Sequence, residues 1–150
     1  MKNPLFVAAC LMTAIACSAA HAAEYSLDFS GVRVPAGERI VGFDITAKSA
    51  YVSSMQTIPN GWDITVDNEP SWIANVRGSI LVGAAAIDLA SLNKMFRIIS
   101  DKASGDVGVS GEVITTLDFE HEHHIALKPA DVRVLGDSPM SSRGRQGGSN

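Results

Sequence analysis

Apolar and polar residues alternate along most of the chain with a period of two, which is typical of half-buried β-strands. The clearest example follows the turn signal Asn60-Gly61, where Trp62, Ile64 and Val66 fall on one face of an extended segment. Comparable alternation occurs at 25–29, 39–47, 51–58, 72–76, 107–119, 125–127 and 131–135. In the segment 107–119, Gly111 interrupts the pattern and predicts a bend or a bulge.

One segment has helical periodicity instead. Leu89, Leu92 and Met95 recur at intervals of three residues, and Asp88 stands at the N-cap position. Residues 95–100 fit either a continued helix or a strand, and we predict a strand because its neighbours are strands. About nine short strands with one short helix predict an all-β fold, an Ig-like antiparallel β-sandwich.

The stretch 59–87 holds both tryptophans and the longest apolar run that follows the first 22 residues, at 80–87. Its small residues Gly83 to Ala86 leave room for a large neighbour, such as a tryptophan, against the backbone. We therefore predict that Trp62 and Trp72 are buried anchors, because large aromatic side chains dominate core burial. In particular, alternation places Trp72 on the inward face of its strand.

An alternative interpretation gives the aromatic residues a role in binding. If Tyr51, Trp62 and Trp72 were exposed together, they would form a platform on which a sugar ring stacks. Burial of all three would leave protein binding as the role of the sandwich.

Residues 1–22 have the organisation of a secretory signal peptide, with Lys2, an apolar segment and the cleavage site Ala20-His21-Ala22. The apolar segment is too short to span a bilayer. We expect cleavage after Ala22 and a periplasmic or extracellular protein. Two alternatives are a lipid anchor on Cys17 and cleavage after Ala20, which would make His21 a terminal copper ligand.

The remaining chain divides into a sandwich domain at 23–135 and a tail at 136–150. The tail is rich in glycine, serine and charge, and we expect it to be disordered. Both cysteines, Cys10 and Cys17, precede the expected mature chain, which excludes a disulfide scaffold and thiolate chemistry in it.

The charge pattern disfavours a nucleic-acid partner. The net charge is −4, and removal of Lys2 with the leader leaves 11 basic against 16 acidic residues, or −5. No stretch concentrates lysine and arginine as phosphate binding requires. The oligomeric state is left open by the sequence.

The sharpest chemical candidate is the cluster Glu120, His121, Glu122, His123 and His124. In an extended segment His121 and His123 project from one face, and the other three residues project from the opposite face. Imidazole and carboxylate together suit zinc, copper or nickel. The competing interpretation is a solvated hairpin tip.

Catalysis has little support in the sequence. Apart from His21 in the leader, every histidine lies in this cluster, and no serine stands near it in the chain. We expect a binding module that contacts a protein or a glycan, with a zinc- or copper-binding protein as the alternative.

The segments RIVGFDITA, PNGW and SWIANVRGSILVGAAAI, between Arg39 and Ile99, resemble the sandwich of bacterial cohesin domains and related carbohydrate-binding modules. The pattern GW…SW…GSxxVGAAA also resembles exported proteobacterial proteins. The resemblance covers about half of the mature chain and includes core and turn residues only. It implies a cohesin-like sandwich with a protein- or sugar-contacting role, and it assigns no contact residue.

Overall fold

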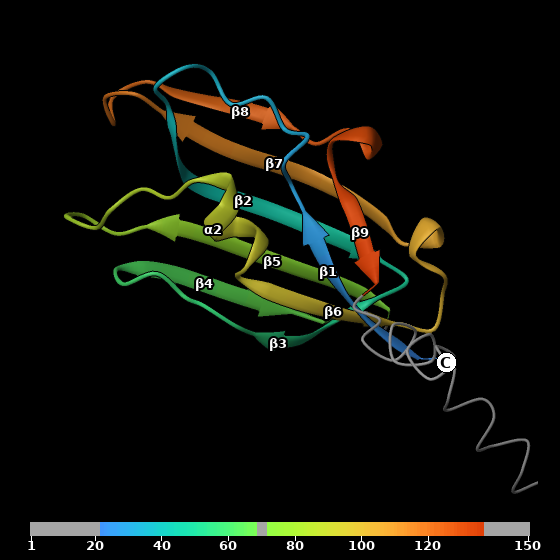
Figure 1. The fold of residues 1–150 in the computed structure, drawn as a ribbon. Coiled ribbons are helices and arrows are strands. Elements are labelled where there is room, and N and C mark those ends of the chain that lie inside the picture. Colours follow the sequence, from blue (N-terminus) through green and yellow to red (C-terminus); the bar gives the residue numbers. More distant parts are fainter. Residues whose placement is uncertain (1–21, 69–71, 137–150) are drawn as a thin grey trace, which may run out of the picture.

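The computed structural model describes residues 22–68 and 72–136. The predicted leader and tail, with Cys17 and His21, lie outside these residues except for Ala22 and Gly136. In the described chain, nine strands form two antiparallel sheets that face each other (Figure 1). The predicted all-β sandwich is therefore confirmed.

The strands are β1 (Ala23–Asp28), β2 (Arg39–Lys48), β3 (Tyr51–Met55), β4 (Trp62–Asp67), β5 (Ile73–Ile80), β6 (Phe96–Ser100), β7 (Gly108–Thr116), β8 (Glu122–Ala126) and β9 (Arg133–Gly136). The helical elements are α2 (Leu89–Asn93), η1 (Ser104–Asp106) and η2 (Pro129–Asp131). The strand predicted at 95–100 is confirmed as β6, which begins at Phe96. The Asp88 N-cap is also confirmed, because the Asp88 carboxylate accepts a hydrogen bond from the Ser91 amide at 2.9 Å. None of the described helices has the length and apolar character needed to cross a membrane.

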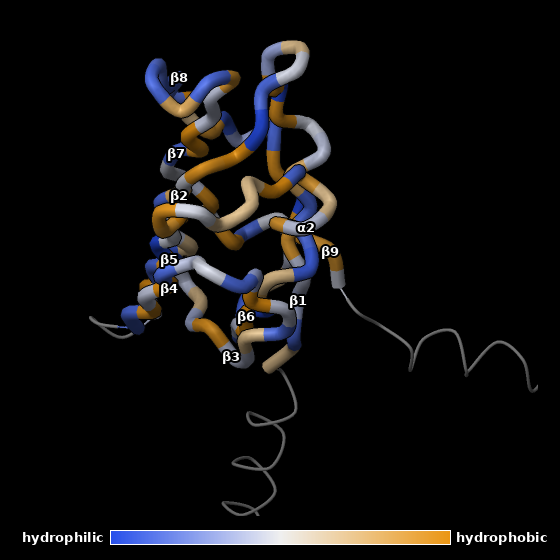
Figure 2. Tube along the Cα trace, turned by 90° about the vertical axis from the view of Figure 1, so that its left-hand side faces the viewer, coloured by the Kyte–Doolittle hydropathy of each residue, from blue (hydrophilic) through white to orange (hydrophobic). Residues whose placement is uncertain are grey.

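One sheet has four strands in the order β3-β6-β1-β9, and the other has five in the order β4-β5-β2-β7-β8. Strand β2 is the axis of the larger sheet, since it pairs with β5 on one side and with β7 on the other. The chain crosses between the sheets after β3, so that the turn at Asn60-Gly61 connects two layers. Figure 2 shows the two layers edge-on, with hydrophobic segments between them.

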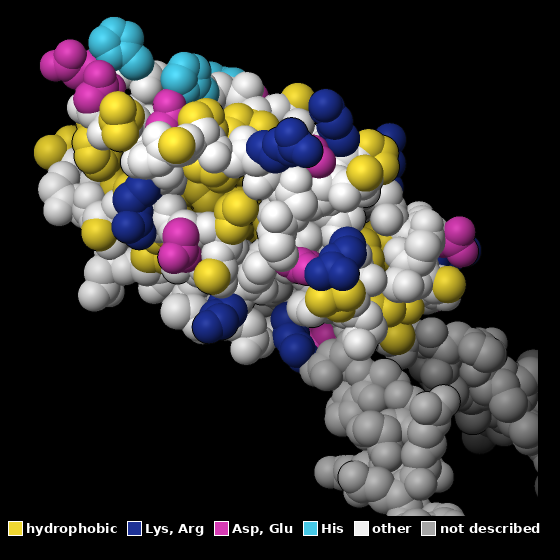
Figure 3. Space-filling view, turned by 45° about the horizontal axis from the view of Figure 1, so that its top comes forward, with side chains coloured by type: hydrophobic (Ala, Val, Ile, Leu, Met, Phe, Trp, Pro, Cys, Tyr) yellow, Lys and Arg dark blue, Asp and Glu magenta, His cyan; other side chains and the backbone are white. Residues whose placement is uncertain are grey.

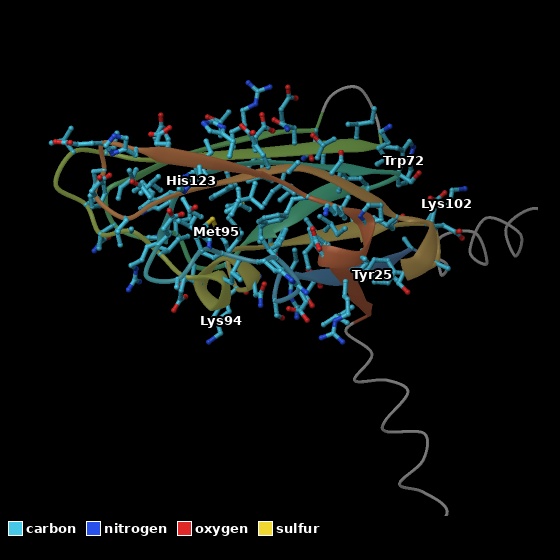
Figure 4. All side chains as sticks on the ribbon, turned by 90° about the horizontal axis from the view of Figure 1, so that it is seen from above. Tyr25, Trp72, Lys94, Met95, Lys102 and His123 are labelled. Carbon is cyan, nitrogen blue, oxygen red and sulfur yellow. The ribbon has the colours of Figure 1, made fainter. Side chains whose placement is uncertain are left out.

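Inward-facing side chains of both sheets form one hydrophobic core. Its largest fully buried members are Phe29, Leu27, Ile40, Ile45, Leu92, Met95 and Ile98. Met95 follows α2 and lies between the layers, as Figure 4 shows. The short helix therefore covers one side of the sandwich and places the apolar side chains of Leu92 and Met95 between the layers.

Trp62 is a core anchor, as the sequence predicts. Its ring is 7% exposed and stacks on Phe43 with a centroid distance of 6.1 Å. Its indole Nε1 donates to the carbonyl oxygen of Ala85 at 3.0 Å. The loop of small residues thus lies against the tryptophan, and the expected packing of a large side chain on this segment is confirmed.

The prediction that Trp72 is buried is wrong. Its side chain is 44% exposed, and its φ of +67° is in the left-handed region. Ala74 and Val76 point inward as expected, at 1% exposure each, because β5 begins only at Ile73. The left-handed conformation of Trp72 interrupts the alternation of inward and outward side chains. The inward pattern of β5 therefore does not include Trp72.

Two other apolar segments lie largely outside the strands, and for 107–119 this corrects the predicted extent of the strand. Residues 81–86 of the run 80–87 form a loop, with Val82 fully exposed, and buried Ile87 pairs with Ile40 of β2. Strand β7 ends at Thr116, so that Leu117 and Phe119 do not continue its inward face and are 69% and 63% exposed. In both places the chain turns out of the sheet although apolar residues continue past the end of the strand.

The bulge in this sheet is not at Gly111. Pairing of β2 with β7 is continuous through Ile45↔Gly111, and the register shifts between Ile40 and Gly42 instead. Glycine is required at position 111 for another reason. Its φ is +123°, and an added Cβ would lie 1.9 Å from the carbonyl oxygen of Asp44.

Asp28 connects elements that are far apart in sequence. Its carboxylate accepts hydrogen bonds from Arg133 in β9 at 2.6 Å and from Asn93 at the end of α2 at 3.2 Å. The amide and hydroxyl of Ser30 also donate to it. These interactions, led by the hydrogen bonds from Ser30, lower the pKa of Asp28 from 3.8 to about 2.

We expect Trp62→Ala to lower the free energy of unfolding by about 3 to 5 kcal/mol, because it removes a buried ring and leaves a cavity. Trp72→Ala is the matched control and should change stability by less than about 1 kcal/mol, because its ring is largely exposed. Urea denaturation followed by circular dichroism measures both. Equal effects of the two substitutions would contradict the assignment of one buried and one exposed tryptophan.

Asp28 should make stability depend on pH at the acid end. Its folded-state pKa is depressed, so its contribution of about 2 kcal/mol is present above pH 4 and is lost as the pH falls towards 2. The difference in unfolding free energy between the wild type and Asp28→Asn should shrink over this range. Asp88 and Asp118 also have lowered pKa values, but their contributions cancel in this difference. A difference that is constant with pH would contradict the prediction.

Candidate functional site

Two of the three predicted stacking residues come together at one end of the sandwich. Tyr51 begins β3 and is 37% exposed, and Trp72 precedes β5. Their ring centroids are 5.5 Å apart with an interplanar angle of 57°. The third predicted residue, Trp62, is in the core and contributes nothing to this surface. The rings of Tyr51 and Trp72 thus pack against each other at a tilt and form one partly exposed aromatic surface, which we call the aromatic notch.

The backbone holds Trp72 in a conformation that bulky residues rarely adopt. Its positive φ costs about 1 to 3 kcal/mol, and such strain persists only where the surroundings impose it. Here the amide of Ala50 donates to the carbonyl oxygen of Trp72 at 3.1 Å. The turn between β2 and β3 is thereby tied to the start of β5, and the indole is placed beside Tyr51.

Polar side chains lie next to the notch on the outer face of the four-stranded sheet. Tyr51 and Glu24 are both paired with Ile99, from opposite sides of β6. The Ser53 hydroxyl donates to one Glu24 oxygen at 2.9 Å, and Arg97 lies 3.7 Å from the other. An aromatic surface therefore borders hydrogen-bonding groups whose orientation is already fixed.

The predicted metal cluster lies at the opposite end of the molecule, in the loop 117–121 and in β8. Figure 3 shows the histidines gathered with acidic side chains at this corner, and Figure 4 shows His123 and Trp72 far apart along the sandwich. Each of the three histidines contacts a different carboxylate through its Nδ1 atom, so the histidines do not share one partner.

His121 contacts Asp118 within the loop, at 2.9 Å between Nδ1 and Oδ2. The other Asp118 oxygen accepts hydrogen bonds from the amides of Glu120 and His121, each at 2.9 Å. These contacts, led by the hydrogen bond from the His121 side chain, hold the pKa of Asp118 well below its usual range. Ligand atoms of Asp118, Glu120 and His121 all lie within 4.8 Å of one another. This is the only such group of three or more among the described residues.

His123 and His124 point to opposite faces of β8. His123 Nδ1 lies 2.5 Å from Glu38, whose side chain is 7% exposed and accepts a hydrogen bond from buried Thr115 at 2.6 Å. His124 Nδ1 lies 3.1 Å from Glu112, and its Nε2 lies 3.7 Å from Glu122. The structure therefore does not bring the three predicted histidines into one coordination sphere.

The sequence pattern did not reveal the residues that organise this corner. Glu38 and Glu112 are 85 and 12 positions from their histidine partners, so only the fold brings them together. Asp118 could have been found, because it is a turn-forming residue just before the cluster. The Glu38 carboxylate lies between the Thr115 hydroxyl and the His123 imidazole. The hydroxyl does not contact the imidazole and is therefore not placed for activation by it.

Comparison with known proteins identifies no relative: neither a family model, nor a curated protein, nor a solved structure matches this chain.

Proposed function

We propose that this protein is an exported, non-catalytic binding module that holds a glycan in the aromatic notch. The single observation that carries the proposal is the exposed pair of Tyr51 and Trp72, 5.5 Å apart, with a tryptophan fixed in a left-handed conformation. Export is proposed from the leader-like residues 1–22.

The chemistry of the notch suits a sugar ring. Aromatic side chains present an apolar surface together with a polar edge, and the apolar face of a pyranose can pack against them. Glu24, Ser53 and Arg97 supply fixed charged and hydroxyl groups beside the rings, and a few such groups usually orient a ligand. With centroids 5.5 Å apart the two rings contact each other, so a sugar would pack on their exposed faces and not between them.

We expect a glycan that binds the notch to shift the fluorescence of Trp72 to shorter wavelength, because its exposed indole loses water contact. Trp72→Ala and Tyr51→Ala should each weaken binding about tenfold or more, as expected for central aromatic contacts. A glycan array would supply the ligand, and isothermal titration would measure the affinity.

Phe119→Ala is the control, since Phe119 is also an exposed aromatic residue but lies beyond the other end of β2. Unchanged binding is expected for this variant. Absence of any glycan hit, or equal affinity of Trp72→Ala and the wild type, would refute the proposal.

A second candidate function is binding of a zinc or copper ion by Asp118, Glu120 and His121. The observation that favours it is their grouping within one short loop, with two carboxylates and one imidazole as donors. These donors suit either ion. Ligands of a tetrahedral zinc lie about 3.3 to 3.5 Å apart. The ligand atoms, which lie within 4.8 Å of one another, would therefore have to move closer together to bind the ion.

Native mass spectrometry of untagged protein tests this second function. We expect one zinc ion per chain in the wild type, and loss of the ion in Asp118→Asn and in His121→Ala. His123→Ala and His124→Ala are matched controls that should retain it, because those rings contact other carboxylates. An apo wild-type spectrum at micromolar zinc would exclude the site.

The same spectrum reports the N-terminus. A chain that begins at Ala23 is expected, and one that begins at His21 with bound copper would support the alternative ligand.

A further inference from the structure

An open groove of about 610 Å³ lies over the outer face of the five-stranded sheet, at the end opposite the aromatic notch. Its floor contains Gly42 and Ile114, from neighbouring strands β2 and β7. Leu81 and Val82 form one wall, and Phe119 belongs to the other. The volume is in the range of ordinary ligand pockets, which is about 300 to 1,000 Å³.

The groove exists because the central strand β2 carries no side chain at Gly42. An added Cβ at Gly42 would lie 3.3 Å from both the Gly78 carbonyl oxygen and the Ile114 side chain, so any larger residue would fill the floor. Around this floor stand three of the most exposed apolar side chains in the described residues: Leu81 at 53%, Val82 at 107% and Phe119 at 63%. Exposed apolar residues gathered around a depression are typical of a contact surface.

Local structure fixes the Phe119 wall. Phe119 has a φ of +65°, and its amide donates to the Thr116 hydroxyl at 3.0 Å. The Thr116 hydroxyl in turn donates to the carbonyl oxygen of His121 at 2.7 Å. The hairpin loop thus holds the phenyl ring at the groove in a strained conformation, although burial would have been favoured by its hydrophobicity.

The surface that continues from the groove is acidic. The register places Asp63, Ser79, Gly42, Ile114 and His124 in one row across the outer face.

The next row contains Thr65, Arg77, Asp44, Glu112 and Ala126, so that Asp44 and Glu112 are direct cross-strand neighbours. Glu122 lines the groove itself. Two basic side chains in these rows already contact the carboxylates: Arg77 lies 3.5 Å from Asp44, and His124 lies 3.1 Å from Glu112. Arg39, the first residue of β2, donates a hydrogen bond from its guanidinium to the carbonyl oxygen of Ala86.

We propose that the groove and the acidic row together bind an extended peptide segment of another protein, with an apolar residue followed two positions later by lysine or arginine. The two rows are about 7 Å apart along the strands, and alternate residues of an extended peptide are separated by the same distance. The apolar side chain occupies the groove over Gly42, and the basic side chain reaches Asp44 and Glu112. Charge complementarity selects this partner over an acidic or purely apolar one.

The test uses two synthetic nonapeptides added to isotopically labelled protein, with amide chemical shifts as the readout. One contains three repeats of Leu-Ser-Lys, and the other contains three repeats of Leu-Ser-Glu. The lysine peptide should bind and shift the amides of Gly42, Ser79 and Ile114, whereas the glutamate peptide should bind about tenfold more weakly or not at all.

Variants separate the apolar from the charged contribution. Phe119→Ser should weaken the lysine peptide about fivefold, and the double variant Glu112→Gln/Glu122→Gln should weaken it by a similar factor and reduce its salt dependence. Asp106→Asn is the control that should leave binding unchanged, because Asp106 is an exposed acidic residue of η1. Circular dichroism confirms that each variant is folded.

Equal binding of the two peptides, or shifts confined to other faces, would overturn the proposal. Failure of the lysine peptide to bind at millimolar concentration would overturn it as well.

Discussion

Contact between the inner faces of two sheets is the interaction on which the whole structure depends. The described chain contains no cysteine, so the layers are held by apolar burial rather than by disulfides. β2 is central to this arrangement because it carries Phe43 and Ile45 into the core while it pairs with strands on both sides. Each surface feature is a consequence of where the chain leaves these two layers.

The aromatic notch and the groove lie at opposite ends of the same central strand. At one end the turn after β2 is tied to Trp72, which is thereby displaced from the inward pattern of β5. At the other end β7 stops at Thr116, and Phe119 is left beside the glycine floor of the groove. Both surfaces use an aromatic residue with positive φ, so backbone strain accompanies aromatic exposure at each.

Electrostatics distinguish the two ends. The notch borders Glu24 and Arg97, whose opposite charges lie close to one another. The groove borders a row in which two carboxylates, Asp44 and Glu112, stand side by side, with Arg77 near the first and His124 near the second. A neutral ligand with many hydroxyl groups suits the first surface, whereas a basic ligand suits the second. The proposed functions of the two ends therefore do not compete for the same ligand.

The amino-acid sequence by itself determined the fold class, the number of strands, the short helix with its Asp88 cap and the burial of Trp62 under a loop of small residues. These features follow from local periodicity and turn chemistry, which act over a few residues. Tertiary structure alone decided the exposure of Trp72 and the separation of the three histidines. Their partners, such as Ala50 for Trp72 and Glu38 for His123, are distant in sequence. A pattern read along the chain contains no information about which strand edge or carboxylate will lie beside a residue once the layers have packed.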